Sequence, residues 1–138
     1  MDAVQVDLWN QTSGEVVGTI ISRQWDGRRA QLSIEAPELD LTLQAAGPDL
    51  FAALQQLRVA LEPLGWIPLC NGARVDCYPS GMARDMGGGA SVYVLSAERS
   101  PGRRLPLVGT FEPAPRESVG AVADQDAYFR KWLKARRG

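Results

Sequence analysis

The strongest constraint on the fold is the alternation of apolar and polar residues in the N-terminal third of the chain. Val4, Val6 and Leu8 are separated by polar residues, which is the period of a strand with one buried face. The same alternation, or a run of β-branched residues, returns after each turn signal. The pattern therefore predicts strands over residues 4–8, 15–25, 32–36 and 39–43.

Two turn signals separate these strands. Asp26-Gly27 is a strong two-residue hairpin signal. Pro37 falls between the last two stretches, and proline cannot donate a hydrogen bond to a neighbouring strand. We therefore expect Pro37 to break or bulge one long strand.

An amphipathic helix is predicted next. Leucines recur at spacings of three and four between Leu50 and Leu64, which is typical of a core-facing helix. Pro48 suits the first helical position, and Asp49 favours the positive end of the helix dipole. Gly65 then marks the end of the helix.

The C-terminal half repeats this order of strands and helix. Asn71-Gly72 is the strongest short hairpin signal, so we predict a hairpin between strands at 66–70 and 73–78. Further strands are predicted at 91–96 and 105–111, with a turn at 100–102 between them. The last helix is predicted to start near Ser118 and to run through Phe129, Trp132 and Leu133.

These elements give a βββα-βββα order without a long βαβ alternation, so the predicted class is α+β. A chain of 138 residues is the length of one ordinary domain. We expect a single α+β domain over residues 1–138, with a mainly antiparallel sheet and both helices on one of its faces.

Composition narrows the function. The chain has no membrane-length apolar run and no signal-peptide pattern, so the expected location is the cytoplasm without a membrane partner. Its two cysteines, Cys70 and Cys77, fit reduced thiols in that compartment. Residues 1–65 carry nine acids and four bases, and residues 66–138 carry seven acids and eleven bases. This asymmetry is too mild to predict nucleic-acid binding.

The chain contains no histidine. Its absence excludes Ser-His-Asp and Cys-His catalytic arrangements and histidine-ligated metals. Two cysteines also cannot complete a four-thiolate zinc site. We therefore expect no catalytic residues, no cofactor and no structural metal.

A long loop after the predicted helix is the candidate site. Loops of this length in compact domains are uncommon, and those that persist are usually functional or disordered. The candidate binding residues in and beside it are Asn71, Arg74, Asp76, Tyr78, Arg84, Asp85, Gly87, Gly88 and Gly89.

The charged and aromatic residues of this loop have two interpretations. They form a surface salt-bridge cluster that only orders the loop, or a patch that contacts a partner, because Arg and Tyr are enriched at binding hot spots. The triple glycine lacks the lysine and the following helix of a phosphate-binding loop, so close backbone approach is the favoured interpretation. Cys77 is expected to point inward with Val75, although Arg74 beside it favours a thiolate.

The segment NGARVDCYPSGMARDMGGG, residues 71–89, followed by VYVL, resembles a segment of a group of small uncharacterised bacterial proteins, chiefly actinobacterial. The resemblance covers about a third of the chain. It implies a small soluble bacterial protein and brings no activity with it.

Two functions remain open at this stage. The leading hypothesis is a non-enzymatic interaction protein with a protein partner, of the immunity or partner-neutralising type. The alternative is a small-molecule or nucleotide-binding domain, enzymatic or not, that uses the loop at 71–91. A deep pocket beside the loop would favour the alternative, and a flat charged or aromatic surface would favour the interaction protein.

Overall fold

The computed structural model describes residues 2–97 and 104–137 and shows an α+β fold with two antiparallel sheets. The larger sheet contains β1 (Asp2–Asn10), β2 (Val16–Asp26), β3 (Arg29–Ala36), β4 (Leu41–Gly47) and β5 (Trp66–Pro68). The smaller sheet contains β6 (Cys77–Tyr78), β7 (Ser91–Val94) and β8 (Leu107–Gly109). The α-helices are α1 (Leu50–Leu61), α2 (Gly81–Asp85) and α3 (Val122–Arg137). Short 3-10 helices are η1 (Pro37–Leu39), η2 (Glu62–Leu64), η3 (Asn71–Ala73) and η4 (Leu95–Ala97). The predicted turn at 100–102 lies outside the described residues.

The larger sheet has the strand order β4-β3-β2-β1-β5, and every neighbouring pair is antiparallel. The predicted alternation is confirmed, because residues at alternate positions, such as Leu8, Ile21 and Ile34, are fully or almost fully buried in the core that also contains the leucines of α1. Asp26 pairs with Arg29, so the Asp26-Gly27 hairpin is confirmed as well.

Pro37 does more than interrupt a strand. Residues 37–39 form η1, and Asp40 follows in the left-handed conformation with φ 54°. This turn reverses the chain, so β4 returns antiparallel to β3 and becomes the edge of the sheet. The predicted break at Pro37 is confirmed, and η1 also turns the chain back on itself.

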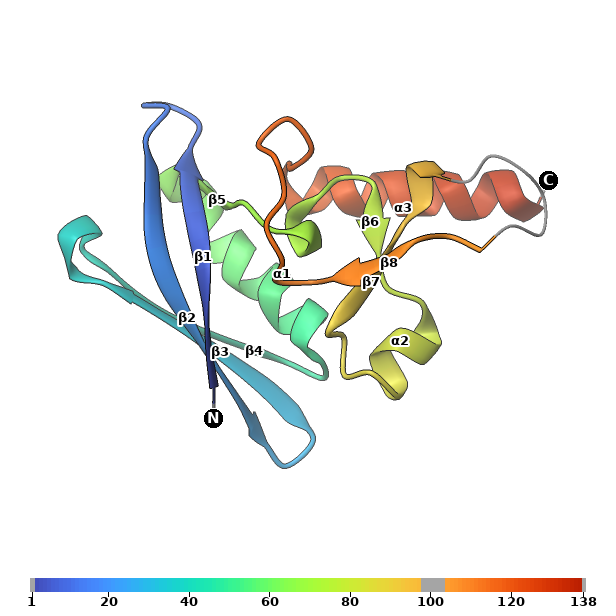
Figure 1. Cartoon of the computed structure of the whole chain (residues 1–138), viewed down its shortest axis with the longest axis horizontal. Coiled ribbons are helices and arrows are strands. Elements are labelled where there is room, and N and C mark those ends of the chain that lie inside the picture. Colours follow the sequence, from blue (N-terminus) through green and yellow to red (C-terminus); the bar gives the residue numbers. More distant parts are fainter. Residues whose placement is uncertain (1, 98–103, 138) are drawn as a thin grey trace.

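Helix α1 lies between the two sheets, with β1–β4 on one side and β6–β8 on the other (Figure 1). Its buried leucines are Leu50, Leu54, Leu57 and Leu61. Leu64 lies beyond the helix in η2 and is 51% exposed, so it does not belong to the buried stripe. Asp49 is the N-cap of α1, because its side chain accepts a hydrogen bond from the Ala52 amide. Pro48 therefore lies before the helix and not at its first position.

The predicted Asn71-Gly72 hairpin is wrong. Asn71–Ala73 forms η3, while β5 pairs with β1 and β6 pairs with β7. The reason is tertiary packing: a Cβ atom on Gly72 would lie 2.5 Å from Leu54 and 2.7 Å from Thr110. Gly72 is therefore needed for this close approach rather than for a turn between strands.

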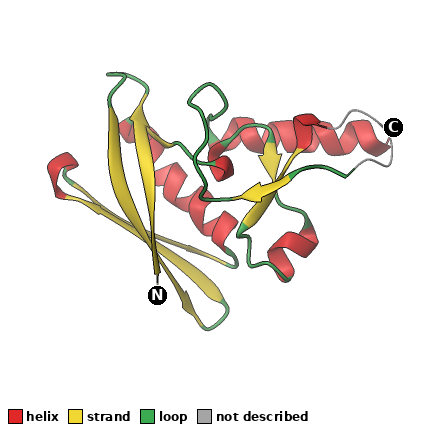
Figure 2. Cartoon of the chain, in the orientation of Figure 1, coloured by secondary structure: helices red, strands yellow, loops and turns green. Residues whose placement is uncertain are grey.

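The second half consequently departs from the βββα-βββα order. The short helix α2 interrupts its strands, and α3 starts at Val122 instead of near Ser118. Helix α3 contacts β6 and α1, whereas α1 is the helix that packs on β3 and β4 of the larger sheet. The two long helices therefore do not share one face of a single sheet, as their separate positions in Figure 2 show.

Candidate functional site

The predicted site residues are divided between several parts of the fold. Arg74 and Asp76 form a two-pronged ion pair, with both nitrogen–oxygen distances at 2.9 Å. The Ser96 hydroxyl donates a further hydrogen bond to Asp76. Burial raises the pKa of Asp76, but these hydrogen bonds and the Arg74 charge outweigh it, so the pKa lies below its ordinary value. Most of the charge of this pair is thus satisfied internally.

Arg84 is tied to the start of α1. Its Nη1 lies 3.1 Å from Oδ2 of Asp49, whose side chain is only 6% exposed. The guanidinium also lies over two aromatic rings, 5.1 Å from the centre of Phe51 and 5.6 Å from the centre of Tyr78. Arg84 therefore links α2 to α1 and to the ring of another predicted site residue.

The triple glycine packs against the N-terminus of α1. The Gly88 carbonyl accepts a hydrogen bond of 2.8 Å from the Leu50 amide. A Cβ atom on Gly89 would lie 2.7 Å from both Asp49 Oδ1 and the Phe51 amide nitrogen. Two of the amides that a phosphate would need at this helix end, those of Leu50 and Ala52, are thus already used by Gly88 and Asp49.

The remaining predicted residues lie apart from one another. Asn71 is 7% exposed and donates its side-chain amide to the Gly109 carbonyl, so it belongs to the interior. Asp85 and Gly87 are exposed at the end of α2 and in the turn that follows it. Tyr78 is the predicted residue that lines an apolar hollow.

That hollow, which we call the aromatic pocket, has a volume of about 210 Å³. Four aromatic side chains from three elements line it together with smaller residues. Its lining consists of Tyr78, Pro79, Ser80, Tyr93, Leu95, Leu105, Phe129 and Trp132. Sequence analysis missed Tyr93, Phe129 and Trp132 as site residues, although the spacing of three between Phe129 and Trp132 places both on one face of a helix.

Backbone pairing and ring stacking position the pocket. Tyr78 and Tyr93 are directly opposite each other in β6 and β7. The Tyr78 ring stacks on Phe129 at 3.9 Å with an angle of 8°, and Phe129 lies 6.2 Å from Trp132. The Tyr78 hydroxyl also donates a hydrogen bond to Asp126 at 3.0 Å. Both the ring and the hydroxyl of Tyr78 are therefore fixed by contacts with α3.

Two arginines flank the aromatic pocket. Arg84 lies over the Tyr78 ring, and Arg136 lies 4.7 Å from the centre of the Trp132 ring. Arg130, Lys131 and Lys134 are exposed on α3 as well. Arg84 is paired with Asp49, whereas the exposed cations of α3 give the C-terminal end of that helix a positive charge.

A buried polar network supports this region from beneath. Arg58, 1% exposed, donates to the carbonyls of Gly72 and Gly120 and to Oε1 of Gln125. Gln125, fully buried, donates to the carbonyls of Gly72, Arg74 and Cys77. Burial lowers the pKa of the Arg58 guanidinium. Among the described residues, no carboxylate forms an ion pair with Arg58. The network ties α1 and α3 to η3 and β6.

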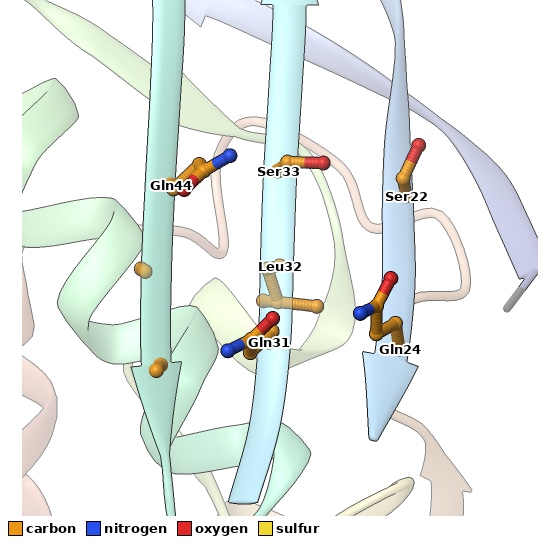
Figure 3. Close-up of a pocket in the computed structure, with 8 residues that line it drawn as sticks. Ser22, Gln24, Gln31, Leu32, Ser33 and Gln44 are labelled. Carbon is orange, nitrogen blue, oxygen red and sulfur yellow. The ribbon is translucent and has the colours of Figure 1, made fainter. Parts of the chain in front are cut away.

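A second hollow of about 320 Å³, which we call the polar groove, lies on the outer face of the larger sheet. Figure 3 shows Ser22, Ser33 and Gln44 in one row across three strands, with Gln24 and Gln31 beside them. These side chains are neutral and exposed or half-buried. They offer hydrogen bonds, and the lining contains no acid or base that could activate the hydroxyls of Ser22 and Ser33.

The groups with nucleophilic potential are held in unreactive states. Burial raises the pKa of Cys70 to about 11 and the pKa of Cys77 to about 12, in spite of Arg74 beside Cys77. Both are therefore thiols at neutral pH. The Ser80 hydroxyl accepts a hydrogen bond from the Ala83 amide and caps α2.

Within residues 2–97 and 104–137, no three His, Cys, Asp or Glu side chains are grouped closely enough to hold a metal ion. In the same part of the chain, no helix has both the length and the apolar character needed to cross a membrane.

No family model matches this sequence. A search of curated proteins likewise finds no match. The resemblance of residues 71–89 to small bacterial proteins stays a prediction.

Proposed function

We propose that this chain is a non-enzymatic interaction protein that binds a protein partner through the aromatic pocket. The observation that carries the proposal is the convergence of Tyr78, Tyr93, Phe129 and Trp132 on one hollow. Tyr, Trp and Arg are the residues that dominate binding energy at protein interfaces, where a few side chains fill well-defined pockets. The aromatic pocket has this composition.

The flanking arginines indicate the chemistry of the partner. Arg84, which is paired with Asp49, lies over the Tyr78 ring, and Arg136 at the cationic end of α3 lies over the Trp132 ring. An apolar or aromatic side chain would fill the hollow, and acidic residues beside it would face the cationic end of α3. The expected partner segment is therefore one anchor residue flanked by Asp or Glu. An immunity-type or partner-neutralising role is the case in which the partner is itself a toxin or an enzyme.

The size of the pocket favours a side chain over a free small molecule. Its volume of about 210 Å³ is below the range of about 300–1,000 Å³ that is usual for small-molecule sites. The loop on which the nucleotide-binding alternative depends is occupied by internal contacts of Asp49, Gly88 and Arg84. Burial raises the pKa values of Cys70 and Cys77, so neither thiol is a ready nucleophile, which supports a non-enzymatic role.

The test selects short random displayed peptides that bind the full chain. We expect the selected peptides to share an apolar or aromatic residue next to acidic ones. Trp132→Ala should weaken their binding at least about tenfold, since truncating a hot-spot residue costs about 2 kcal/mol or more. Trp25→Ala is the matched control, because Trp25 is an exposed tryptophan at the end of β2 and does not line the pocket.

Thermal melts of both variants establish that they fold. Equal binding of the peptides to wild type and folded Trp132→Ala would contradict the proposal. Competition by a free nucleotide at the same pocket would favour the alternative function instead.

A further inference from the structure

The two edges of the larger sheet are protected to very different degrees. β5 forms one edge; it has three residues and ends at Pro68. β4 forms the other edge; it has seven residues, Leu41 to Gly47, without proline or charge. Natural proteins usually protect an edge with a short strand, a proline or charged side chains. β5 has the first two of these features, and β4 has none of the three.

The free edge of β4 carries unused backbone groups. In an antiparallel pair, every second residue of a strand exchanges hydrogen bonds with its partner, and the other residues point their N–H and C=O groups away. β4 pairs with β3 along its whole length, from Leu41 opposite Ala36 to Gly47 opposite Ala30. Within the described residues, no segment other than β3 forms a hydrogen bond to its backbone. Figure 3 shows β4 as the outermost of the three strands that line the polar groove.

We propose that β4 pairs antiparallel with β4 of a second copy of this chain. Such pairing joins the two larger sheets into one and satisfies the outward N–H and C=O groups of both edges. A two-fold axis relates the copies, as in most symmetric dimers.

The side chains of β4 favour a second copy as the occupant. Full-length antiparallel pairing of two identical strands places the central residue, Gln44, opposite its own copy. Leu43 then lies opposite Ala45, and Thr42 lies opposite Ala46. On each face of the sheet a larger side chain therefore meets a small one. The Gln44 amide has both donors and an acceptor, so the two copies can hydrogen-bond to each other.

The burial of Leu43 agrees with this arrangement. Leu43 packs against the main core but stays only half-buried in the single chain. A neighbouring strand would cover its exposed side. Thr42 and Gln44 are exposed, so changes at either position can act on the pairing without disturbing the core.

This inference does not rest on the proposed function. The aromatic pocket is formed by the smaller sheet and α3, and β4 contributes no residue to it. Variants at β4 and at the pocket therefore separate self-association from partner binding.

The first experiment uses disulfide trapping with Gln44→Cys. Opposite residues of an antiparallel pair have Cα atoms about 4.5–5.5 Å apart. That separation is within the range of about 4.4–6.8 Å for disulfides. Cys70 and Cys77 are fully buried with raised pKa values, so the introduced thiol reacts first. Gln31→Cys is the control, because Gln31 is exposed on the same face but lies in β3, away from the edge.

We expect mild oxidation to convert Gln44→Cys to a covalent dimer at least about tenfold faster than Gln31→Cys. Equal rates for the two variants would contradict the proposal.

The second experiment measures mass by sedimentation over a range of concentrations. We expect wild type and Gln31→Lys to form the same dimer. Gln44→Lys should weaken dimerisation at least about tenfold, because it places two like charges directly opposite each other. A wild-type chain that stays monomeric at every soluble concentration would overturn the proposal. So would a dimer that Gln44→Lys leaves unchanged.

Discussion

At the scale of single residues, two buried polar side chains hold the C-terminal half in place. Gln125 is fully buried and donates its amide to three backbone carbonyls from η3 to β6. Its oxygen accepts from Arg58 at 2.6 Å and from Gln55 at 3.1 Å. One side chain therefore satisfies groups that the irregular segment between β5 and β6 would otherwise bury without partners.

We predict that Gln125→Ala lowers the free energy of unfolding by at least about 2 kcal/mol, since leaving a buried polar group unpaired costs about 1–3 kcal/mol. Alanine is a good helix former, so α3 itself loses nothing. Gln56→Ala, an exposed glutamine on α1, should stay within about 0.5 kcal/mol of wild type. Denaturant unfolding of the two variants gives the comparison. A Gln125→Ala curve that overlays the Gln56→Ala curve would show that water or rearrangement replaces the network.

The Arg74–Asp76 pair predicts a pH dependence. The pKa of Asp76 is lowered in the folded chain, so its contribution to stability is present above its ordinary value of 3.8 and is lost as the pH falls through the folded value. Asp76→Asn lacks this contribution at every pH. The difference in unfolding free energy between wild type and Asp76→Asn should thus be constant above about pH 5 and shrink below about pH 4. A difference that stays constant into the acid range would mean that the carboxylate gains nothing from Arg74 and Ser96.

At the scale of elements, the glycine-rich segment packs against the N-terminus of α1. Gly88 and Gly89 both have positive φ, 64° and 76°, and they bring the backbone against Asp49 at the first turn of the helix. The Thr110 hydroxyl donates to the Gly89 carbonyl at 2.7 Å from the other side. The segment therefore connects α1, α2 and the smaller sheet through backbone and side-chain contacts.

We predict that Gly89→Ala destabilises the fold strongly, because its Cβ would lie 2.7 Å from backbone and from a buried carboxylate in a conformation that favours glycine. Gly81→Ala in the neighbouring helix α2 is the matched change, since a Cβ there meets nothing within 4 Å. Thermal melts should separate the two variants clearly. If the two melting temperatures fall equally, the close packing of Gly89 is not what holds the segment.

The elements that depend on local pattern could be predicted from the sequence. The alternation of apolar and polar residues in β1 to β3 identifies the buried face of each strand, and the leucine stripe identifies the buried face of α1. The Asn71-Gly72 segment could not, because Leu54 and Thr110, both distant in sequence, decide its conformation. The aromatic pocket likewise depends on residues that are distant in sequence. Tyr78 was identified as a candidate, but its neighbours Tyr93, Phe129 and Trp132 are brought to it only by tertiary structure.

At the scale of the whole molecule, α1 connects two cores. Leu54 and Leu57 belong to the core beneath the larger sheet, whereas Phe51 on the same helix belongs to the core of the smaller sheet. The two sheets lie on opposite sides of α1 (Figure 1). The larger sheet carries the polar groove and an open edge, and the smaller sheet with α3 carries the aromatic pocket. The proposed partner binding and self-association therefore use opposite parts of the molecule.

The site of peptide binding can be mapped on the isotope-labelled full chain by NMR. A selected peptide with an apolar anchor and acidic neighbours is titrated into the protein. We predict that the largest chemical-shift changes fall around Tyr78, Tyr93 and Trp132, and that added salt weakens the binding. Changes centred instead on the polar groove around Ser33 and Gln44, with the aromatic pocket unaffected, would contradict this prediction.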